Sequence, residues 1–217
     1  MNSVNLELYL VLDPVLCGGE DGMIQTALEA VQGGCTIVQL RAPAWKKRRI
    51  AECGRALLKA LAPTGTPLIV DDHVDVALAI GAQGVHVGQQ DLQPRDARRL
   101  MGPRAIIGYS VSSGRELSLC TPLVQEGAVD YLGIGPVWAT ATKPDAAAPL
   151  GLAGFTALAA RRPCPAVAIG AVNAGNAASL AEAGADGLAV VSAICGQPDP
   201  RAAAASLLHA FRQGLSR

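Results

Sequence analysis

The chain has 217 residues, no formal net charge, 50% hydrophobic residues and only 3% aromatic residues. Its core must therefore come from Ala, Val, Leu and Ile, and the balanced charge argues against nucleic-acid binding, which needs an excess of Lys and Arg. No apolar run reaches about 18 residues, so we expect no membrane span. The N-terminus lacks a signal-peptide pattern, which predicts a cytoplasmic protein. The six cysteines lie far apart, so neither disulfides nor a zinc site is expected.

Short apolar segments typical of buried parallel strands alternate with segments of helical spacing along the chain. Gly and Pro residues separate most of these elements. We expect strands at residues 8–12, 35–41, 67–72, 84–88, 105–110, 130–137, 166–170 and 187–192. We expect helices at residues 24–31, 45–61, 74–80, 94–100, 113–125, 152–160, 174–183 and 201–212.

Several local signals mark the helix ends. Ser113 and Glu116 stand in capping-box register at the start of one helix, and Asp199 precedes Pro200 at the start of the last helix. Pro122 lies inside the predicted helix at 113–125, where it should kink or break it.

Eight strands alternating with eight helices predict a single (β/α)8 TIM barrel spanning residues 1–217. The chain is shorter than the roughly 250 residues typical of that fold. An open doubly wound sheet is the alternative, but no G-x-G-x-x-G follows the first strand. The pattern assigns no oligomeric state.

Polar residues gather at the ends of the predicted strands, where a barrel of this kind places its chemistry. Alternation in the second strand puts Gln39 and Arg41 on its inward face, and a buried Arg needs an anionic partner. The other polar or small residues at strand ends are Asp71, Asp72, His86, Gln89, Asp91, Ser110, Thr140, Thr142, Lys143, Gly170, Val191 and Ser192.

Asp72 and Asp91 follow neighbouring strands and are expected to converge. Two carboxylates beside Arg41 and Lys143 would suit Mg²⁺, which takes few protein carboxylates and completes its shell with water and phosphate. The alternative is that each Asp caps the following helix, which is easier to accept for Asp72 than for Asp91.

Three further features could bind an anion or a substrate. Thr140, Thr142 and Lys143 follow the sixth strand as an anion site would require. Gly170 and Val191-Ser192 follow strands seven and eight, where barrels bind phosphate through backbone N–H groups, although small residues there could serve only as tight turns. His86 could line the mouth of the barrel and contact a substrate, or be a satisfied structural residue, whereas His73 and His209 suggest no function.

The motifs of the chain resemble those of the thiamine phosphate synthase family over nearly the whole length. The most specific are G-Q-Q-D at residues 88–91 and G-P-V-W-A-T-A-T-K at residues 135–143. Supporting motifs are Q-L-R, V-D-D-H-V-D-V-A, I-G-Y-S and G-A-D-G-L-A-V-V-S-A-I. The resemblance implies an enzyme that joins hydroxymethylpyrimidine diphosphate to a thiazole phosphate and releases pyrophosphate.

The resemblance also implies a role for each matching residue. Asp72 and Asp91 would be Mg²⁺ ligands, and Arg41, Ser110 and Lys143, with Gln39 nearby, would contact the pyrimidine and its diphosphate. The thiazole phosphate would be held by Thr140, Thr142, Gly170, Ala171, Val191 and Ser192. Residues 141–150 would form a lid over the site.

Three positions depart from the pattern of the family. Pro43 replaces a lysine, Asp71 replaces an asparagine, and Ala171 replaces the second of two glycines. The first two make the site less positive by two charges, which should weaken diphosphate binding unless Asp71 joins the metal shell or is partly protonated.

Two other functions fit the same barrel. A thiazole tautomerase shares the fold but needs no diphosphate site, and the retention of Asp72, Asp91 and T-A-T-K argues against it. A non-catalytic barrel that binds a phosphometabolite would retain the phosphate cradle and show no turnover.

Overall fold

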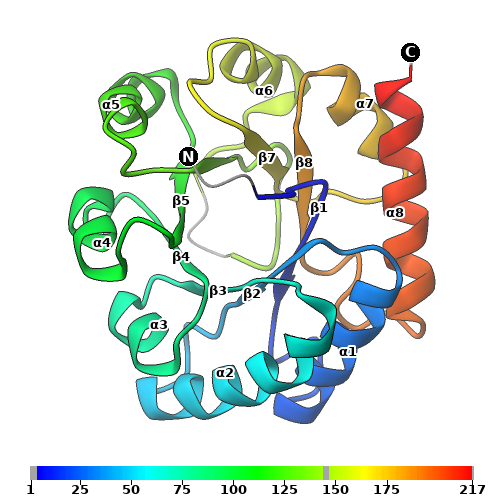
Figure 1. Cartoon of the computed structure of the whole chain (residues 1–217). Coiled ribbons are helices and arrows are strands. Elements are labelled where there is room, and N and C mark those ends of the chain that lie inside the picture. The colour runs from blue at the N-terminus through cyan, green and yellow to red at the C-terminus, as the bar shows by residue number, and fades with distance from the viewer. Residues whose placement is uncertain (1–3, 144–146, 217) are drawn as a thin grey trace.

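The computed structural model describes residues 4–143 and 147–216. It is a closed barrel of parallel strands in sequence order, each strand pairing with the next and β8 pairing with β1. Figure 1 shows the helices arranged around this ring of strands. The predicted (β/α)8 TIM barrel is therefore confirmed, and the doubly wound alternative is wrong.

The barrel strands are four to six residues long. They are β1 Leu8–Leu12, β2 Ile37–Leu40, β3 Leu68–Asp71, β4 Gly84–Val87, β5 Ile106–Val111, β6 Tyr131–Ile134, β7 Ala166–Ile169 and β8 Gly187–Val190. The helices are α1 Glu20–Gln32, α2 Lys47–Leu61, α3 Val74–Ile80, α4 Pro94–Met101, α5 Gly114–Gln125, α6 Gly151–Ala159, α7 Ala177–Glu182 and α8 Pro200–Leu215, with a 3₁₀ turn at Ala62–Thr64. No helix among the described residues is both long and apolar enough to span a membrane.

The core has two layers because alternate residues of each strand face opposite ways. The larger layer lies between strands and helices and contains the outward residues of β2, Val38 and Leu40. The smaller layer fills the barrel and includes Tyr9, Ile37 and Tyr131. This split confirms the predicted alternation of the second strand, with Gln39 on the inner side.

The predicted helix caps are confirmed. The Ser113 hydroxyl accepts from the Glu116 amide at 3.2 Å, while the Glu116 carboxylate turns to Ser112. Asp199 accepts from the Ala202 amide at 2.8 Å at the start of α8. Both bonds satisfy amides that the first turn of a helix leaves without a partner.

Of the predicted kink or break at Pro122, the break is wrong, and so is the predicted start of the seventh helix. Pro122 does not end its helix, because α5 continues to Gln125. The carbonyl deprived of a partner belongs to Ser118, which is exposed, so water can satisfy it. The seventh helix begins at Ala177 instead of residue 174, because Asn173 and Asn176 form side-chain bonds to nearby amides that compete with helical ones.

Candidate functional site at the carboxyl end of the barrel

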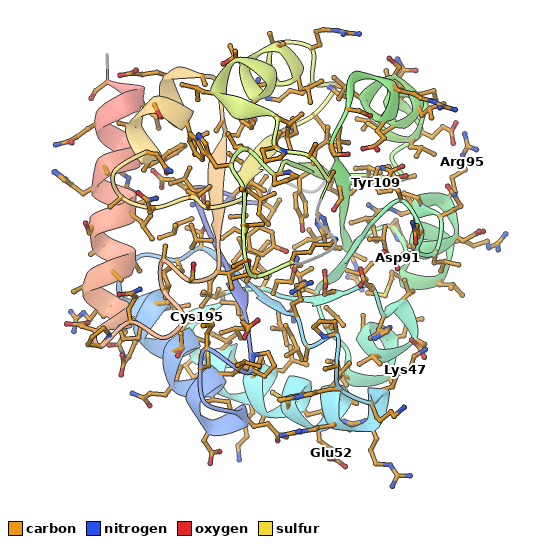
Figure 2. All side chains as sticks on the ribbon, turned by 180° about the vertical axis from the view of Figure 1, so that it is seen from behind. Lys47, Glu52, Asp91, Arg95, Tyr109 and Cys195 are labelled. Carbon is orange, nitrogen blue, oxygen red and sulfur yellow. The ribbon has the colours of Figure 1, made fainter. Side chains whose placement is uncertain are left out.

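Three carboxylates meet at the carboxyl ends of β3 and β4. Asp71 is the last residue of β3 and stands opposite His86 of β4. Asp72 follows directly, and Asp91 lies in the loop after β4, where its carboxylate accepts from the Gly88 amide at 2.8 Å. Figure 2 shows Asp91 on the same side of the barrel as Tyr109 of neighbouring β5.

The backbone of Asp72 rules out its capping role. Its φ is 59°, in the left-handed region, and its amide donates to the His86 carbonyl at 2.8 Å. The N-cap of α3 is His73, with no side-chain capping bond. Asp91 does not cap a helix either, because the N-cap of α4 is Gln93. The helix-capping alternative for both residues was therefore wrong.

Burial, together with repulsion from neighbouring carboxylates, raises the pKa of Asp71 and of Asp72. Burial raises the pKa of Asp71 to about 6, against the attraction of Arg41 and Lys143. The pKa of Asp72 rises to about 7, first because of burial and then because of the charges of Asp71 and Asp91. A hydrogen bond between Asp72 and Asp91, which needs a shared proton, raises that pKa further. A nearby cation would relieve this repulsion.

Arg41 connects two parts of the site. Its Nε lies 3.3 Å from the Asp71 carboxylate, and both side chains are mostly buried. One of its terminal nitrogens donates to the Thr142 carbonyl at 3.4 Å. The anionic partner expected for a buried Arg is thus Asp71 in this structure. Lys143 is exposed, and its charge acts on Asp71, Asp72 and His86.

The two threonines of T-A-T-K contact each other. Their hydroxyls lie 2.9 Å apart, and the Thr142 amide donates to the Thr140 hydroxyl at 3.3 Å. The segment is therefore a compact turn held to β2 by Arg41. Of the predicted lid at 141–150, residues 144–146 lie outside the described part of the chain.

The turn after β7 is tight. Gly170 has a φ of 106°, and a Cβ there would lie 2.6 Å from the Pro136 Cβ, so no other residue fits without a shift. Ala171 has a φ of 51° although it is not a glycine. Beyond β8, the Val191 carbonyl accepts the amides of Ile194 and Cys195, and the Ser192 side chain is exposed. This geometry agrees with the tight-turn alternative, and phosphate binding by these residues stays a prediction.

A buried chain of side chains runs through the barrel to the site. Gln39 donates to the Tyr9 hydroxyl at 2.8 Å, and that hydroxyl lies 2.8 Å from the Tyr131 hydroxyl. His86 lies 3.0 Å from the Tyr131 hydroxyl through Nδ1 and 2.9 Å from the Ser110 hydroxyl through Nε2. Burial, with help from the charge of Lys143, lowers the pKa of His86 to about 4, so its ring is neutral. His86 is therefore satisfied by protein partners.

The carboxylates are suited to Mg²⁺. In residues 4–143 and 147–216, no group of three or more His, Cys, Asp or Glu could hold a metal ion unaided. Mg²⁺ does not require one, because it is commonly bound by one or two carboxylates together with water and substrate phosphate. Asp72 and Asp91 offer hard oxygen ligands, and their repulsion is what a divalent cation would offset.

Comparison with known proteins decides the family. The family model described as thiamine monophosphate synthase matches residues 8–194. The chain is 51% identical to a thiamine-phosphate synthase from Laribacter hongkongensis, over 92% of each chain. It is 50% identical to one from Azorhizobium caulinodans, over 94% of this chain and 93% of the other.

This chain belongs to the thiamine monophosphate synthase family. A solved structure, a thiamine phosphate pyrophosphorylase from Pyrococcus furiosus, agrees with a TM-score of 0.84 at 33% identity, covering 97% of this chain and 98% of the other. The predicted resemblance is confirmed, and with it the assignment as a transferase of thiamine biosynthesis.

Sequence reasoning missed two residues of this family member. Tyr9 and Tyr131 complete the chain between Gln39 and His86, yet neither was predicted as a site residue. The sequence did contain a signal for them. The protein has only three tyrosines, and two of them stand in otherwise aliphatic strands. A hydroxyl buried in a strand has to find a partner.

Proposed function

We propose that this chain makes thiamine phosphate by joining hydroxymethylpyrimidine diphosphate to a thiazole phosphate at the carboxyl end of the barrel. The proposal rests on the coupling of Asp72 with Asp91 at the carboxyl ends of β3 and β4. Arg41 pairs with the neighbouring Asp71, and the chain is about half identical to thiamine-phosphate synthases. Its binding partners would be these two small-molecule substrates.

The reaction proceeds by ionisation of the pyrimidine substrate. The bond between its methylene carbon and the diphosphate oxygen breaks, and the electron pair leaves with pyrophosphate. The thiazole nitrogen then donates its lone pair to the methylene cation and forms the C–N bond. No protein nucleophile is required, so the side chains need only bind, orient and exclude water.

Arg41 and Lys143 stabilise the negative charge that grows on the leaving diphosphate. Asp72 and Asp91 would hold Mg²⁺, which when bound would neutralise diphosphate charge as a Lewis acid. Asp71 and Ser110 face the pyrimidine side of the site, and the buried Gln39 and His86 support it from within the barrel. The thiazole phosphate would lie against the residues after β6, β7 and β8, which are Thr140, Thr142, Gly170, Ala171, Val191 and Ser192.

The pairing of Arg41 with Asp71 affects the affinity for the diphosphate substrate. Part of the guanidinium charge meets a carboxylate, and the exposed Pro43 adds no charge. Because the pKa of Asp71 is raised to about 6, Asp71 is close to neutral in mildly acidic solution. Binding of the diphosphate would raise that pKa further and free Arg41 for the substrate.

The direct test is to incubate the purified protein with both substrates and Mg²⁺ and to follow pyrophosphate release and thiamine phosphate formation. We expect equal amounts of the two products and loss of both after chelation of the metal. Tautomerisation of a thiazole carboxylate alone, or tight phosphate binding without turnover, would overturn the proposal. An authentic synthase assayed alongside controls for the substrates.

A further inference from the structure

The buried chain of side chains has a direction. Gln39 donates through its amide nitrogen, so the Tyr9 oxygen accepts. The Tyr9 hydrogen is then directed to its other partner, the Tyr131 oxygen. The Tyr131 hydrogen in turn is left for His86 Nδ1. Each hydroxyl has one hydrogen to give, so the arrangement that bonds every buried hydrogen to one of these partners runs from Gln39 to His86.

The direction sets the state of the His86 ring. An Nδ1 that accepts from Tyr131 carries no hydrogen, so the hydrogen of the neutral ring lies on Nε2. Nε2 then donates to the Ser110 oxygen at 2.9 Å. The hydrogen of Ser110 remains available to a group beyond the chain, in the mouth of the barrel.

The packing around the chain keeps it intact. Tyr9, Tyr131 and Gln39 are at most 4% exposed, so water cannot replace a lost partner easily. Gly108 of β5 makes room for the contact between Tyr131 and His86, because a Cβ there would lie within 2.3 Å of both side chains. Burial also raises the pKa of both tyrosines, which keeps each hydroxyl protonated.

We propose that Gln39, Tyr9 and Tyr131 are positioning residues that hold His86 in the Nε2–H form and thereby orient the Ser110 hydroxyl as a hydrogen-bond donor to the substrate. The role of Ser110 toward substrate rests on the proposed function. The chemistry selected is a lone-pair acceptor without its own hydrogen, such as a diphosphate oxygen or an unprotonated ring nitrogen. In the opposite ring form, the Ser110 hydrogen would be directed to His86 Nε2 and would not be available to the substrate.

The ring state can be measured without any catalysis. Nitrogen-15 NMR of the ¹⁵N-histidine-labelled protein distinguishes a protonated from an unprotonated ring nitrogen, and a His86→Gln spectrum identifies the signals. We expect hydrogen on Nε2 and none on Nδ1 in the ligand-free protein. Hydrogen on Nδ1 would reverse the direction of the chain and overturn the inference.

A variant at the far end of the chain tests whether the chain sets that state. Gln39→Met removes the first donor without touching the ring, so His86 should change from a single form to a mixture of both. The matched control is Gln83→Met, which makes the same substitution at a side chain that accepts from the Leu68 amide and lies outside this series. An unchanged His86 in Gln39→Met would overturn the positioning role.

Kinetics provide a second readout. Tyr131→Phe should lower kcat/KM by about threefold to tenfold, the loss expected from one hydrogen bond. The same change made in Ser110→Ala should have no further effect, because Tyr131 acts through Ser110. Additive losses would refute this route, and Tyr9→Phe repeats the test if Tyr131→Phe folds poorly. Inactivity of the wild type would refute the proposed function. The NMR result would still decide the direction of the hydrogen bonds from Gln39 to Ser110.

Discussion

The acidic residues at the two ends of the barrel differ in how their charges are compensated. At the amino end, Glu7, Asp130 and Asp186 immediately precede β1, β6 and β8, and each is paired with an arginine: Arg212, Arg98 and Arg162 respectively. Asp130 and Asp186 also accept backbone amides at 2.8 Å. At the carboxyl end, Asp72 faces two further carboxylates and has a raised pKa.

Backbone strain follows the same division. Among the described residues, the only non-glycine residues with positive φ are Asp72 and Ala171, and both lie at the carboxyl end. Left-handed backbone is unfavourable for residues with a Cβ, by about 1–2 kcal/mol. The amino end therefore stabilises the barrel, whereas the carboxyl end holds crowded carboxylates and left-handed backbone, as functional sites often do.

The largest expected effect is at the amino end. Asp130→Asn leaves Arg98 largely buried without its carboxylate, which should lower the free energy of unfolding by about 3 kcal/mol. Urea unfolding measures it. Asp199→Asn makes the same chemical change at a helix cap with no arginine partner, and Asn caps as well as Asp. Equal stability of the two variants would contradict the structural role of the Asp130 pair.

At the carboxyl end, Asp72→Asn should reduce synthase turnover at least about tenfold, a loss on the scale of removing one group that stabilises transition-state charge. Asn also tolerates the left-handed backbone. Without metal at pH 8, Asp72→Asn should melt at a higher temperature than wild type, because a carboxyl group whose folded-state pKa is raised to about 7 destabilises the fold once ionised.

Asp75→Asn is the matched control for Asp72→Asn, since Asp75 is exposed on α3 and pairs with Lys47. It should leave turnover unchanged. An Asp72→Asn protein with normal turnover would remove Asp72 from the proposed metal site.

Ala171→Gly tests the strain at the carboxyl end. Glycine adopts the φ of 51° freely, so the free energy of unfolding should rise by about 1 kcal/mol. Ala153→Gly, on an exposed position of α6, should instead lower it by about 1 kcal/mol. A loss of stability in both variants would show that Ala171 is not strained. Urea unfolding of wild type and both variants measures these changes in the free energy of unfolding.

Pro43→Lys tests whether the carboxyl end lacks positive charge. An added cation near the diphosphate should lower its KM by about twofold to fivefold, the value of an exposed charge pair. Pro63→Lys adds the same charge after α2, near the amino end of the barrel, and should leave KM unchanged. Steady-state kinetics at low salt measure both. Equal KM values in wild type and Pro43→Lys would show that Arg41 and Lys143 suffice.

The smallest effect is expected for Glu7→Gln. The hydrogen bond from Arg212 lowers the pKa of Glu7 below 4.5, so its stabilisation is full above pH 4.5 and is lost as pH falls through the folded-state pKa. Glu7→Gln should be destabilised by less than about 1 kcal/mol at pH 7 and match wild type in strong acid. Glu52→Gln, exposed on α2, controls for the lost charge. A gap that persists in strong acid would contradict this origin.

The order of elements was readable from the sequence because it depends on local patterns. Apolar runs, Gly and Pro between elements, and the Ser113 and Asp199 caps act over a few residues, and the structure confirms them. The start of α7 was misjudged because the side chains of Asn173 and Asn176 compete with the helix at short range. Pro122 was misjudged because an exposed carbonyl tolerates the lost bond.

By itself the sequence determined the barrel, the family motifs and the polar residues that end each strand, since these follow from local periodicity and residue identity. Only the tertiary structure decided the partner of Arg41, the left-handed backbone of Asp72 and the meeting of Tyr9 with Tyr131, which are 122 residues apart. Closing the barrel brings distant strands together across its interior. The direction of the chain from Gln39 to Ser110 therefore exists only in the folded protein.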